Sequence, residues 1–441
     1  MRLPFTGRRS GSEGPDRAGG GGTFAALGVR NYKFYFYGQI VSVSGTWMQS
    51  LAQMWLVLEL THNGVWLGLV TATQFLPMML FGPYGGLIAD RVDKRKMLLF
   101  TQSAAGTLAL VLGVLTMTHS VQLWMVFALA FGLGCVNTVD NPTRQSFVME
   151  MVGTGMITNA VTLNSVVING ARIVGPAIAG VLIGTVGVGP CFIINAASFL
   201  AVILSLSLMR RHELLPVERV VRAKGQLKDG LRYAWKTPAL RTPLLLVTVV
   251  GTLAYNFTVT LSLLASRTFH AGASGFGIMT SCMGAGAVVG GLIAASRSRP
   301  TGRRLVAVSF ALGATLLTCA VMPVYPAELA ALVLMGVANI GFIATANTTL
   351  QLASAPEMRG RVMALYGVAF LGTTPIGGPL VGWISQVAGP RAGIGVGGIA
   401  CVLAAAAALP SLTGVRLPWR RSRGGEVVLS VPSPEETVGA I

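Results

Sequence analysis

Charged side chains are scarce in this chain, at 11% of its 441 residues, while hydrophobic residues make up 53%. The mean hydropathy of +0.67 excludes an ordinary soluble domain. The five cysteines lie singly in apolar stretches, without the spacing of a metal site or a disulfide framework. No GxxxxGK[ST] motif is present, which argues against an ATP-driven pump. We therefore predict no metal, no cofactor and no enzymatic activity.

Long apolar runs are the dominant feature of the sequence. A helix needs about 20 apolar residues to cross a bilayer, and runs of that order recur about twelve times, in two groups of six. The chain is thus predicted to be an all-α membrane protein with about twelve transmembrane helices in two six-helix bundles. The expected spans are 36–59, 65–88, 97–117, 122–140, 160–184, 188–209, 243–265, 275–296, 305–324, 327–349, 362–387 and 391–412.

The charge is strongly unbalanced, with a formal net value of +18. If the N-terminus is cytoplasmic, 30 of the 33 Lys and Arg residues fall on the cytoplasmic side, all except Arg172, Arg267 and Arg391. Such asymmetry follows the positive-inside rule, so it indicates orientation and not a nucleic-acid partner. We predict a multi-pass plasma-membrane protein with the bilayer as its solvent and both termini in the cytoplasm.

The two groups of spans are separated by a basic connector and resemble each other. NPTRQ at 141–145 and NTTLQ at 347–351 end the fourth and tenth spans, and GPAIAG at 175–180 is matched by GPLVG at 378–382. Parallel repeats of this kind are typical of transporters with alternating access. The predicted units are a disordered cytoplasmic leader (1–30), an N-terminal bundle (31–209), a connector with an amphipathic helix (210–242), a C-terminal bundle (243–412) and a cytoplasmic tail (413–441).

Several stretches resemble a known transporter family. GGLIADRVDKRK at 85–96 is similar to the loop motif of the major facilitator superfamily, in which Gly and three residues precede Asp-Arg and a basic run. DNPTRQSFVMEMV (140–152), NAVTLNSVVINGARIVGPAIAG (159–180) and EMRGRVMALYGVAFLGTTPIGGPLVG (357–382) resemble the branch with enterobactin-type siderophore exporters and macrolide efflux proteins. The resemblance implies the major facilitator fold, a small-molecule substrate and a monomer.

The loop motif is predicted to act as a conformational latch. Asp90 ends the second span, where its carboxylate can accept hydrogen bonds from the N-terminus of a neighbouring helix; the resemblance implies that this neighbour is the eleventh span. A plain positive-inside anchor is the alternative. The residues assigned to the latch are Gly86, Asp90, Arg91, Asp93, Lys94 and Arg95, of which Asp93 stands where many members have Gly.

Arg172 is the exceptional charge, because it lies roughly 18 Å into the fifth span at 1.5 Å per residue. A charge at that depth costs about 2.5–3.5 kcal/mol, which favours a wet cavity or a buried partner; a structural tie to backbone carbonyls is the alternative. Other polar side chains fall at similar depth, and Trp47 and Tyr255 add aromatic surface. The predicted substrate cavity comprises Thr46, Gln49, Gln53, Asn164, Asn169, Arg172, Asn256 and Asn339, although each polar residue could instead make a helix-packing hydrogen bond.

Two further features bear on direction and driving force. Gly175, Pro176 and Gly180 resemble the Gly-Pro motif of antiporters in the superfamily, with Ala179 in place of one usual glycine, and this favours export. Proton coupling needs a carboxylate in or near the membrane, and the candidates counted in the sequence are Glu59, Asp90 and Asp140. Asp140 is the possible proton site, with a helix-end ion pair to Arg144 as the alternative, because the helix is expected to break before Pro142.

The sequence therefore predicts a secondary transporter that exports an organic compound, such as a drug, a siderophore or another natural product, by alternating access and coupled to proton entry. A proton symporter that imports a small metabolite is the alternative.

Overall fold

The computed structural model describes residues 24–215, 226–296 and 301–414, and within these residues the chain forms helices and turns without a β-strand. Ten helical stretches are long and apolar enough to cross a membrane. The helices of the first half are α1 (Arg30–Thr61), α2 (Gly64–Arg91), α3 (Lys94–Met117), α4 (Leu123–Val186) and α5 (Gly189–Ser207). After α6 (Gln226–Lys236), the second half contains α7 (Pro238–Val249), α8 (Phe257–Leu263), α9 (Gly272–Ser296), α10 (Gly302–Val321), α11 (Tyr325–Ala353), α12 (Pro356–Phe370), α13 (Thr374–Val387) and α14 (Pro390–Gly414).

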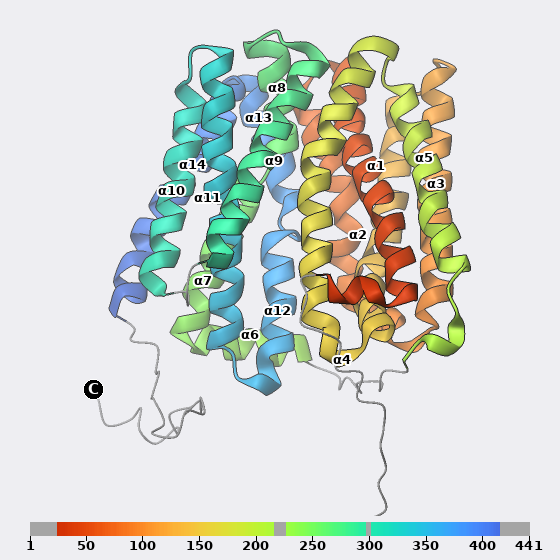
Figure 1. Ribbon diagram of the computed structural model, residues 1–441. Helices are drawn as coiled ribbons and strands as arrows, with labels where there is room; N and C mark the ends of the chain where they lie inside the picture. Colours follow the sequence, from red (N-terminus) through yellow and green to blue (C-terminus); the bar gives the residue numbers. More distant parts are fainter. Residues whose placement is uncertain (1–23, 216–225, 297–300, 415–441) are drawn as a thin grey trace, which may run out of the picture.

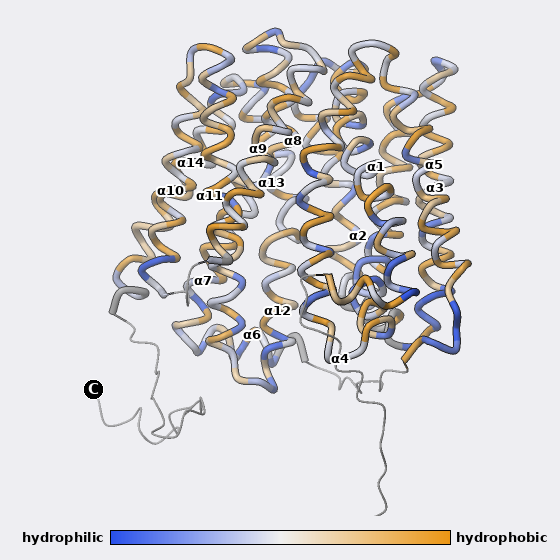
Figure 2. Tube along the Cα trace, viewed as in Figure 1, coloured by the Kyte–Doolittle hydropathy of each residue, from blue (hydrophilic) through white to orange (hydrophobic). Residues whose placement is uncertain are grey.

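The helices form two upright groups side by side, with α1–α5 in one and α7–α14 in the other (Figure 1). The start of α1 and the end of α14 lie at the same end of the molecule, and α6 runs across that end beneath the second group (Figure 1). Hydrophilic residues gather there, while the middle of the molecule is largely hydrophobic (Figure 2). We call this end the basic end and the other the opposite end.

The stretch labelled α4 consists of two helices that meet at a kink at Gly153, and they contain the expected fourth and fifth spans. The first helix does not break before Pro142; the non-helical residue at the kink is Gly153, with φ 71° and ψ 177°, a conformation that glycine readily adopts. Pro142 frees the carbonyl of Thr138, because proline has no N–H to donate to it. Gly85 of α2 packs against that carbonyl, and a Cβ at Gly85 would lie 2.2 Å from its oxygen. Close packing between α2 and α4 therefore covers the freed carbonyl.

Two spans of the second half are interrupted where single helices were expected. Between α7 and α8 the chain passes through a π-helical stretch, Val250–Ala254, and leaves the helix at Tyr255 and Asn256. The other break separates α12 from α13 at residues 371–373. The breaks lie together, because a Cβ at Gly377 would lie 1.8 Å from the Thr252 carbonyl oxygen, and one at Gly251 would lie 2.6 Å from that of Phe370.

Glycines join the two halves through the helices that carry the repeated Gly-Pro motifs. Gly180 of α4 packs on Gly277 of α9, and Gly378 of α13 packs on Gly68 of α2. Nearer the opposite end, the Gly64 N–H donates to Gln386 Oε1 at 2.8 Å, and Arg267 donates to the carbonyl of His62. The described contacts between the halves thus extend from the middle of the molecule to the opposite end.

At the basic end, α6 covers the stretch for which an amphipathic helix is predicted and holds the start of α12. Asp229 lies 3.7 Å from Arg361 in an ion pair, and the Ala355 N–H donates to Tyr233 Oη at 3.2 Å. Within the predicted leader, Ala25–Gly28 form a short 3₁₀ helix in which Ala26 is buried. Residues 1–23 of the predicted leader and 415–441 of the predicted tail lie outside the described residues.

Candidate functional site

A cavity of about 180 Å³ lies between the two halves, at the level where α7/α8 and α12/α13 are interrupted. The first half contributes side chains from α1, α2 and α4, and the second half contributes side chains from the α7–α8 region, α9, α11 and the α12–α13 break. Apolar and aromatic residues such as Trp47, Phe75 and Phe257 form much of its wall. A mostly apolar lining with a few converging polar groups is typical of sites for organic ligands.

Arg172 supplies the positive charge of this cavity. Its guanidinium carbon lies 5.1 Å above the ring centroid of Trp47, and Nη2 lies 3.5 Å from the hydroxyl of Tyr255 in the other half. Nε is buried without a hydrogen-bond partner. Among the described residues, no carboxylate forms an ion pair with Arg172. A cation–π contact and one long hydrogen bond leave most of its hydrogen-bonding capacity free for a ligand.

The main chain around Arg172 is held firmly against α9. A Cβ at Gly284 would lie 2.8 Å from the Arg172 carbonyl oxygen, and the Ser281 hydroxyl donates to the Ile173 carbonyl at 2.9 Å. Because the carbonyls of Arg172 and of the next residue are both packed against α9, the side chain projects from a rigid position. Such rigidity favours a binding site over an adaptable surface charge.

Two asparagines of the second half line the same cavity, and each has a buried amide oxygen without a hydrogen-bond partner. Asn256 is 3% exposed and its Nδ2 donates to the Thr252 carbonyl at 2.8 Å, so its Oδ1 remains as a buried acceptor without a partner. Asn339 on α11 is 4% exposed, and its Oδ1 also has no partner. Buried polar atoms without partners are uncommon in folded proteins, and three of them line this one cavity.

The structure brings only some of the predicted cavity residues to this place. Arg172, Asn256 and Asn339 line it, as do Trp47 and Tyr255. Gln53 donates to Gln74, which lines the cavity, at 3.4 Å. The remaining predicted residues are Thr46, Gln49, Asn164 and Asn169, and the cavity lining does not include them.

Three of these four predicted residues, all except Asn164, have hydrogen-bond partners outside the cavity. Gln49 is buried and accepts a hydrogen bond from Asn195 on α5, while Thr46 and Asn169 donate to the carbonyls of Ser42 and Ser165, one helical turn earlier. The sequence reasoning missed Thr71, Gln74 and Phe75 on α2. Thr71 and Gln74 lie three positions apart in the second span, on the same face of a helix, and this was a usable signal in the sequence.

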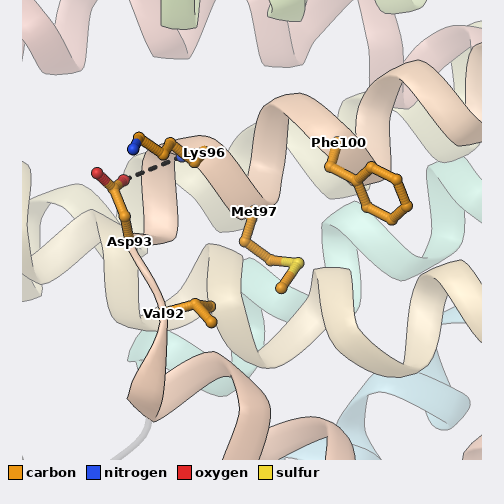
Figure 3. Close-up of a pocket in the computed structure, with 5 residues that line it drawn as sticks. All are labelled: Val92, Asp93, Lys96, Met97 and Phe100. Carbon is orange, nitrogen blue, oxygen red and sulfur yellow. Dashed lines mark hydrogen bonds between the residues drawn. The ribbon is translucent and has the colours of Figure 1, made fainter.

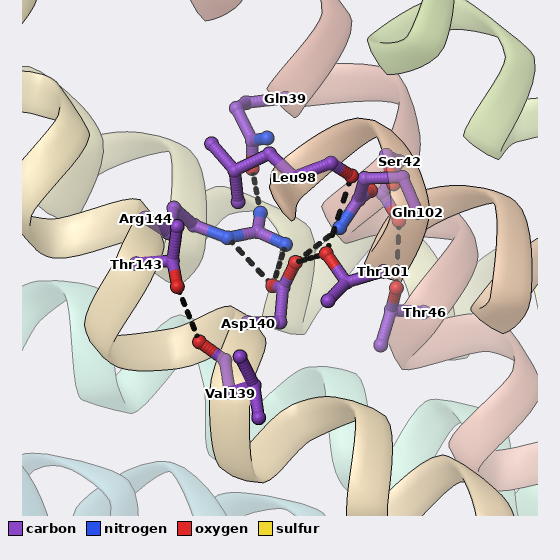
Figure 4. Close-up of polar contacts among 10 residues, drawn as sticks. All are labelled: Gln39, Ser42, Thr46, Leu98, Thr101, Gln102, Val139, Asp140, Thr143 and Arg144. Atoms are coloured by element: carbon purple, nitrogen blue, oxygen red, sulfur yellow. Dashed lines mark hydrogen bonds and ion pairs between the residues drawn. The ribbon is translucent and has the colours of Figure 1, made fainter. Parts of the chain in front are cut away.

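Asp140 lies in a saturated polar network near the basic end of the first half (Figure 4). Its Oδ1 accepts from Thr101 at 2.6 Å and from Gln102 at 2.8 Å. Its Oδ2 accepts from two nitrogens of Arg144, at 3.1 and 2.5 Å, and Arg144 also donates to Gln39. This geometry is that of the ion pair named as the alternative to a proton site. A carboxylate with four hydrogen bonds is stabilised in its charged form.

A buried carboxylate of the second half was overlooked in the sequence. Glu328 lies one turn into α11 and is fully buried, with the thiol of Cys319 on α10 beside its carboxylate. Arg391 of α14 lies in its neighbourhood and donates through Nη2 to the Met322 carbonyl at 2.7 Å, while its Nε has no partner. Glu328 should have been counted with Glu59, Asp90 and Asp140, because it lies inside the predicted tenth span.

In the loop between α2 and α3, the described basic side chains make contacts within the first half. Lys94 forms an ion pair with Glu150, and the buried Arg95 donates to the carbonyls of Leu206 and Ser207 at the end of α5, at 2.6 and 3.0 Å. Cations are favourable at a helix C-terminus. These contacts hold α3 against α4 and α5.

The remaining latch residues are placed only in part. Arg91 is exposed, whereas the side chains of Gly86 and Asp90 lie outside the described residues. Asp93 caps α3, because its Oδ1 accepts from the Lys96 N–H at 3.0 Å (Figure 3); this explains an acidic residue at a position where the motif often has Gly. The shallow hollow beside it includes Met97 and Phe100, and Phe100 is 70% exposed, so this hollow faces outward, away from the cavity.

A family model described as transmembrane secretion effector matches residues 21–431. The chain belongs to that family, within the major facilitator superfamily. The staphyloferrin A transporter of Staphylococcus aureus is 25% identical over 267 residues, which cover 59% of this chain and 65% of that protein, just under two thirds of its length. The multidrug efflux pump Tap of Mycolicibacterium fortuitum is 26% identical over 378 residues, or 81% of this chain and 89% of that protein.

Solved structures agree on the fold. A bacterial homologue of the human lysosomal transporter Spinster, in an inward-facing and unoccupied conformation, aligns with a TM-score of 0.68 and 13% identity over 87% of this chain and 98% of its own. A peptide-bound transporter of the POT family aligns with a TM-score of 0.71 and 11% identity over 87% and 97% of the two chains. At this level of identity the likeness concerns the fold alone, and it confirms the predicted all-helical major facilitator architecture.

Proposed function

We propose that this transporter exports a medium-sized organic compound across the plasma membrane by alternating access, with the cavity around Arg172 as its substrate site. The observation that carries the proposal is the position of Arg172: an arginine without a carboxylate partner, in a cavity shared by the two halves. A ligand bound there touches both halves and so senses their relative movement. Relatives named for drug efflux and siderophore transport support export over import.

The membrane arrangement in this proposal has twelve crossings in two bundles and a monomeric chain. The first six are α1, α2, α3, the two parts of α4 on either side of Gly153, and α5. The second six are α7 with α8, then α9, α10 and α11, then α12 with α13, and finally α14. The basic end faces the cytoplasm, because Lys and Arg concentrate there. With contacts between the halves at the opposite end, this conformation is the one open toward the cytoplasm.

Proton entry is the proposed driving force. The polar contacts of Asp140 and Glu328 indicate which of these two carboxylates fits better as the proton carrier. Asp140 remains the predicted proton site, but its four hydrogen bonds argue for a permanent ion pair with Arg144. Glu328 fits a proton carrier better, since it is fully buried beside the Cys319 thiol and Arg391 and accepts fewer hydrogen bonds than Asp140, which makes its charged form costly. It lies near the opposite end, where protons would enter.

Asp90 completes the proposed cycle as a latch. In this conformation the described partners of Lys94 and Arg95 lie in the first half. The start of α12 is hydrogen-bonded to α6 instead. When the cytoplasmic side closes, we propose that the carboxylate of Asp90 binds the N-terminus of α12. Pro176 and Gly180 meet Gly277 of α9, and the small surface there would let α4 and α9 slide against each other, whereas Gly175 packs against α1.

Comparison of culture media tests the proposal. Untargeted mass spectrometry is applied to a strain that lacks the gene, the same strain with the wild-type gene, and the same strain with Arg172→Ala. Export predicts compounds that disappear from the medium and accumulate in the cells of the deletion strain, with recovery by the wild type and poor recovery by Arg172→Ala. Compounds that instead remain in the medium of the deletion strain would establish import.

A further inference from the structure

The unpartnered polar atoms of the cavity differ in kind between the two halves of the protein. The first half presents a cation, Arg172, whose Nε has no partner and whose Nη2 makes one long hydrogen bond of 3.5 Å. The second half presents two amides, Asn256 and Asn339, whose Oδ1 atoms have no partner. The cation can only donate hydrogen bonds, and the Oδ1 atoms can only accept them.

We propose that the cavity selects organic anions that also carry a hydroxyl or N–H donor, and that such a ligand bridges the two halves. This inference rests on the proposed function and specifies its substrate class. The anionic oxygens bind the guanidinium of Arg172 in pairs. The donor binds Oδ1 of Asn256, whose direction is fixed because its Nδ2 is already bonded to Thr252. The apolar frame of the ligand lies against Trp47 and Phe257.

Asn256 is suited to this role by its place in the chain. It follows the π-helical stretch Val250–Ala254 and precedes α8, so a ligand bonded to it contacts the interruption itself. Its neighbour Tyr255 packs on Phe370 at the end of α12, with ring centroids 4.5 Å apart. A ligand hydrogen-bonded to Asn256 therefore contacts the first interruption directly and the second through the packing of Tyr255 on Phe370.

The combination of one cation and two amide acceptors in the cavity excludes two other classes of ligand. An organic cation would face the uncompensated charge of Arg172 at short range, which is unfavourable in a partly desolvated site. A purely apolar compound would fill the cavity and leave three buried polar atoms without water or partner. An anion without a donor satisfies Arg172 but leaves the buried acceptors of Asn256 and Asn339 without a partner.

Binding of four matched probes to the purified protein in lipid nanodiscs tests the inference. The probes are phenyllactate, which has a carboxylate and a hydroxyl; 3-phenylpropanoate, which lacks the hydroxyl; 3-phenyl-1,2-propanediol, which lacks the carboxylate; and phenethylammonium, a cation. Binding is measured by isothermal titration calorimetry. Phenyllactate should bind at least about tenfold more tightly than each of the others, because a site that hydrogen-bonds a donor discriminates against analogues without it.

Variants then assign the preference to residues. In Asn256→Leu and Asn339→Leu, phenyllactate should lose its advantage over 3-phenylpropanoate and keep its advantage over the diol. In Arg172→Gln, the advantage over the diol should disappear. Asn169→Leu is the matched control, because Asn169 lies on the same helix as Arg172 and bonds to its own helix. Its probe ranking should be that of the wild type.

Equal binding of phenyllactate and 3-phenylpropanoate to the wild type, or no binding of phenyllactate, would overturn the inference. Because the comparison uses wild-type protein, it does not depend on whether each variant folds. Neither result touches the proposed function, which is decided by the comparison of culture media. A transporter that exports compounds yet does not distinguish the probes would retain its function and lose this substrate class.

Discussion

Gly68 of α2 and Gly378 of α13 meet across the two halves so closely that a Cβ on Gly68 would lie 2.2 Å from the Gly378 carbonyl oxygen. No side chain other than hydrogen fits at this contact without moving the backbone of the other half. This close contact between the two glycines can therefore form only in the conformation in which the halves meet at the opposite end.

Gly68→Ala is expected to open that end. Overpacking costs about 1–3 kcal/mol, enough to shift a balanced equilibrium by roughly 5- to 150-fold. In a cysteine-free background with Ser50→Cys in the cavity, impermeant thiol reagents added from outside should label the Gly68→Ala protein faster. Gly82→Ala on the same helix is the control, because nothing lies within 4 Å of a Cβ there. Equal labelling of the two proteins would contradict the expected shift.

Asp140→Asn should lower the free energy of unfolding by about 2 kcal/mol, because it leaves Arg144 partly buried without its counter-charge. The double variant Asp140→Asn/Arg144→Gln should lose less than the two single changes together. Thermal unfolding in detergent measures both. A single variant as stable as the wild type, but unable to couple transport to a pH gradient, would instead identify Asp140 as the proton carrier.

Glu328→Gln is expected to keep the fold, since glutamine replaces a buried carboxylate by a neutral group of the same shape. We expect a pH gradient to drive uptake into inverted vesicles in the wild type, and the variant to lose that drive while retaining exchange of the substrate. The control is Glu213→Gln, which removes an ion pair with Arg210 at the basic end. A variant that retains full gradient-driven transport would exclude Glu328 as the carrier.

Asp90→Asn is expected to leave the protein stable while slowing its transport cycle, because it weakens a contact formed in the other conformation. Asp93→Asn is a close control, since asparagine also caps a helix N-terminus and should preserve α3. Transport rates measured in proteoliposomes decide the matter. Identical rates for both variants and the wild type would leave the loop as a simple anchor.

Orientation can be checked with single cysteines in a cysteine-free background. A cysteine at Thr301, between α9 and α10, should react with impermeant reagents only in inverted vesicles. A cysteine at Ser120, between α3 and α4, should react in intact cells. The reverse pattern would place the basic end outside.

Sequence periodicity was sufficient for the fold and for Arg172, because hydrophobic length and one midplane charge are local properties. It failed where a distant backbone decides the outcome. The expected break before Pro142 is wrong, because Gly85 of α2 packs over the freed carbonyl of Thr138. Gln49 appeared as a cavity residue because its partner, Asn195, is 146 positions away. The breaks at Asn256 and at 371–373 also could not be located, since their packing depends on each other.

The two interrupted helices have an evolutionary consequence. Both belong to the second half, whereas α4 continues through Pro142 and holds the first half together. Substitutions at Asn256 and near residues 371–373 can change how the cavity wall bends without removing a contact of Arg172, whereas the Tyr255 hydroxyl contacts its guanidinium. Descendants of this protein can therefore broaden or narrow the range of compounds they accept by altering the wall of one half, and such changes should accumulate there before Arg172 is replaced.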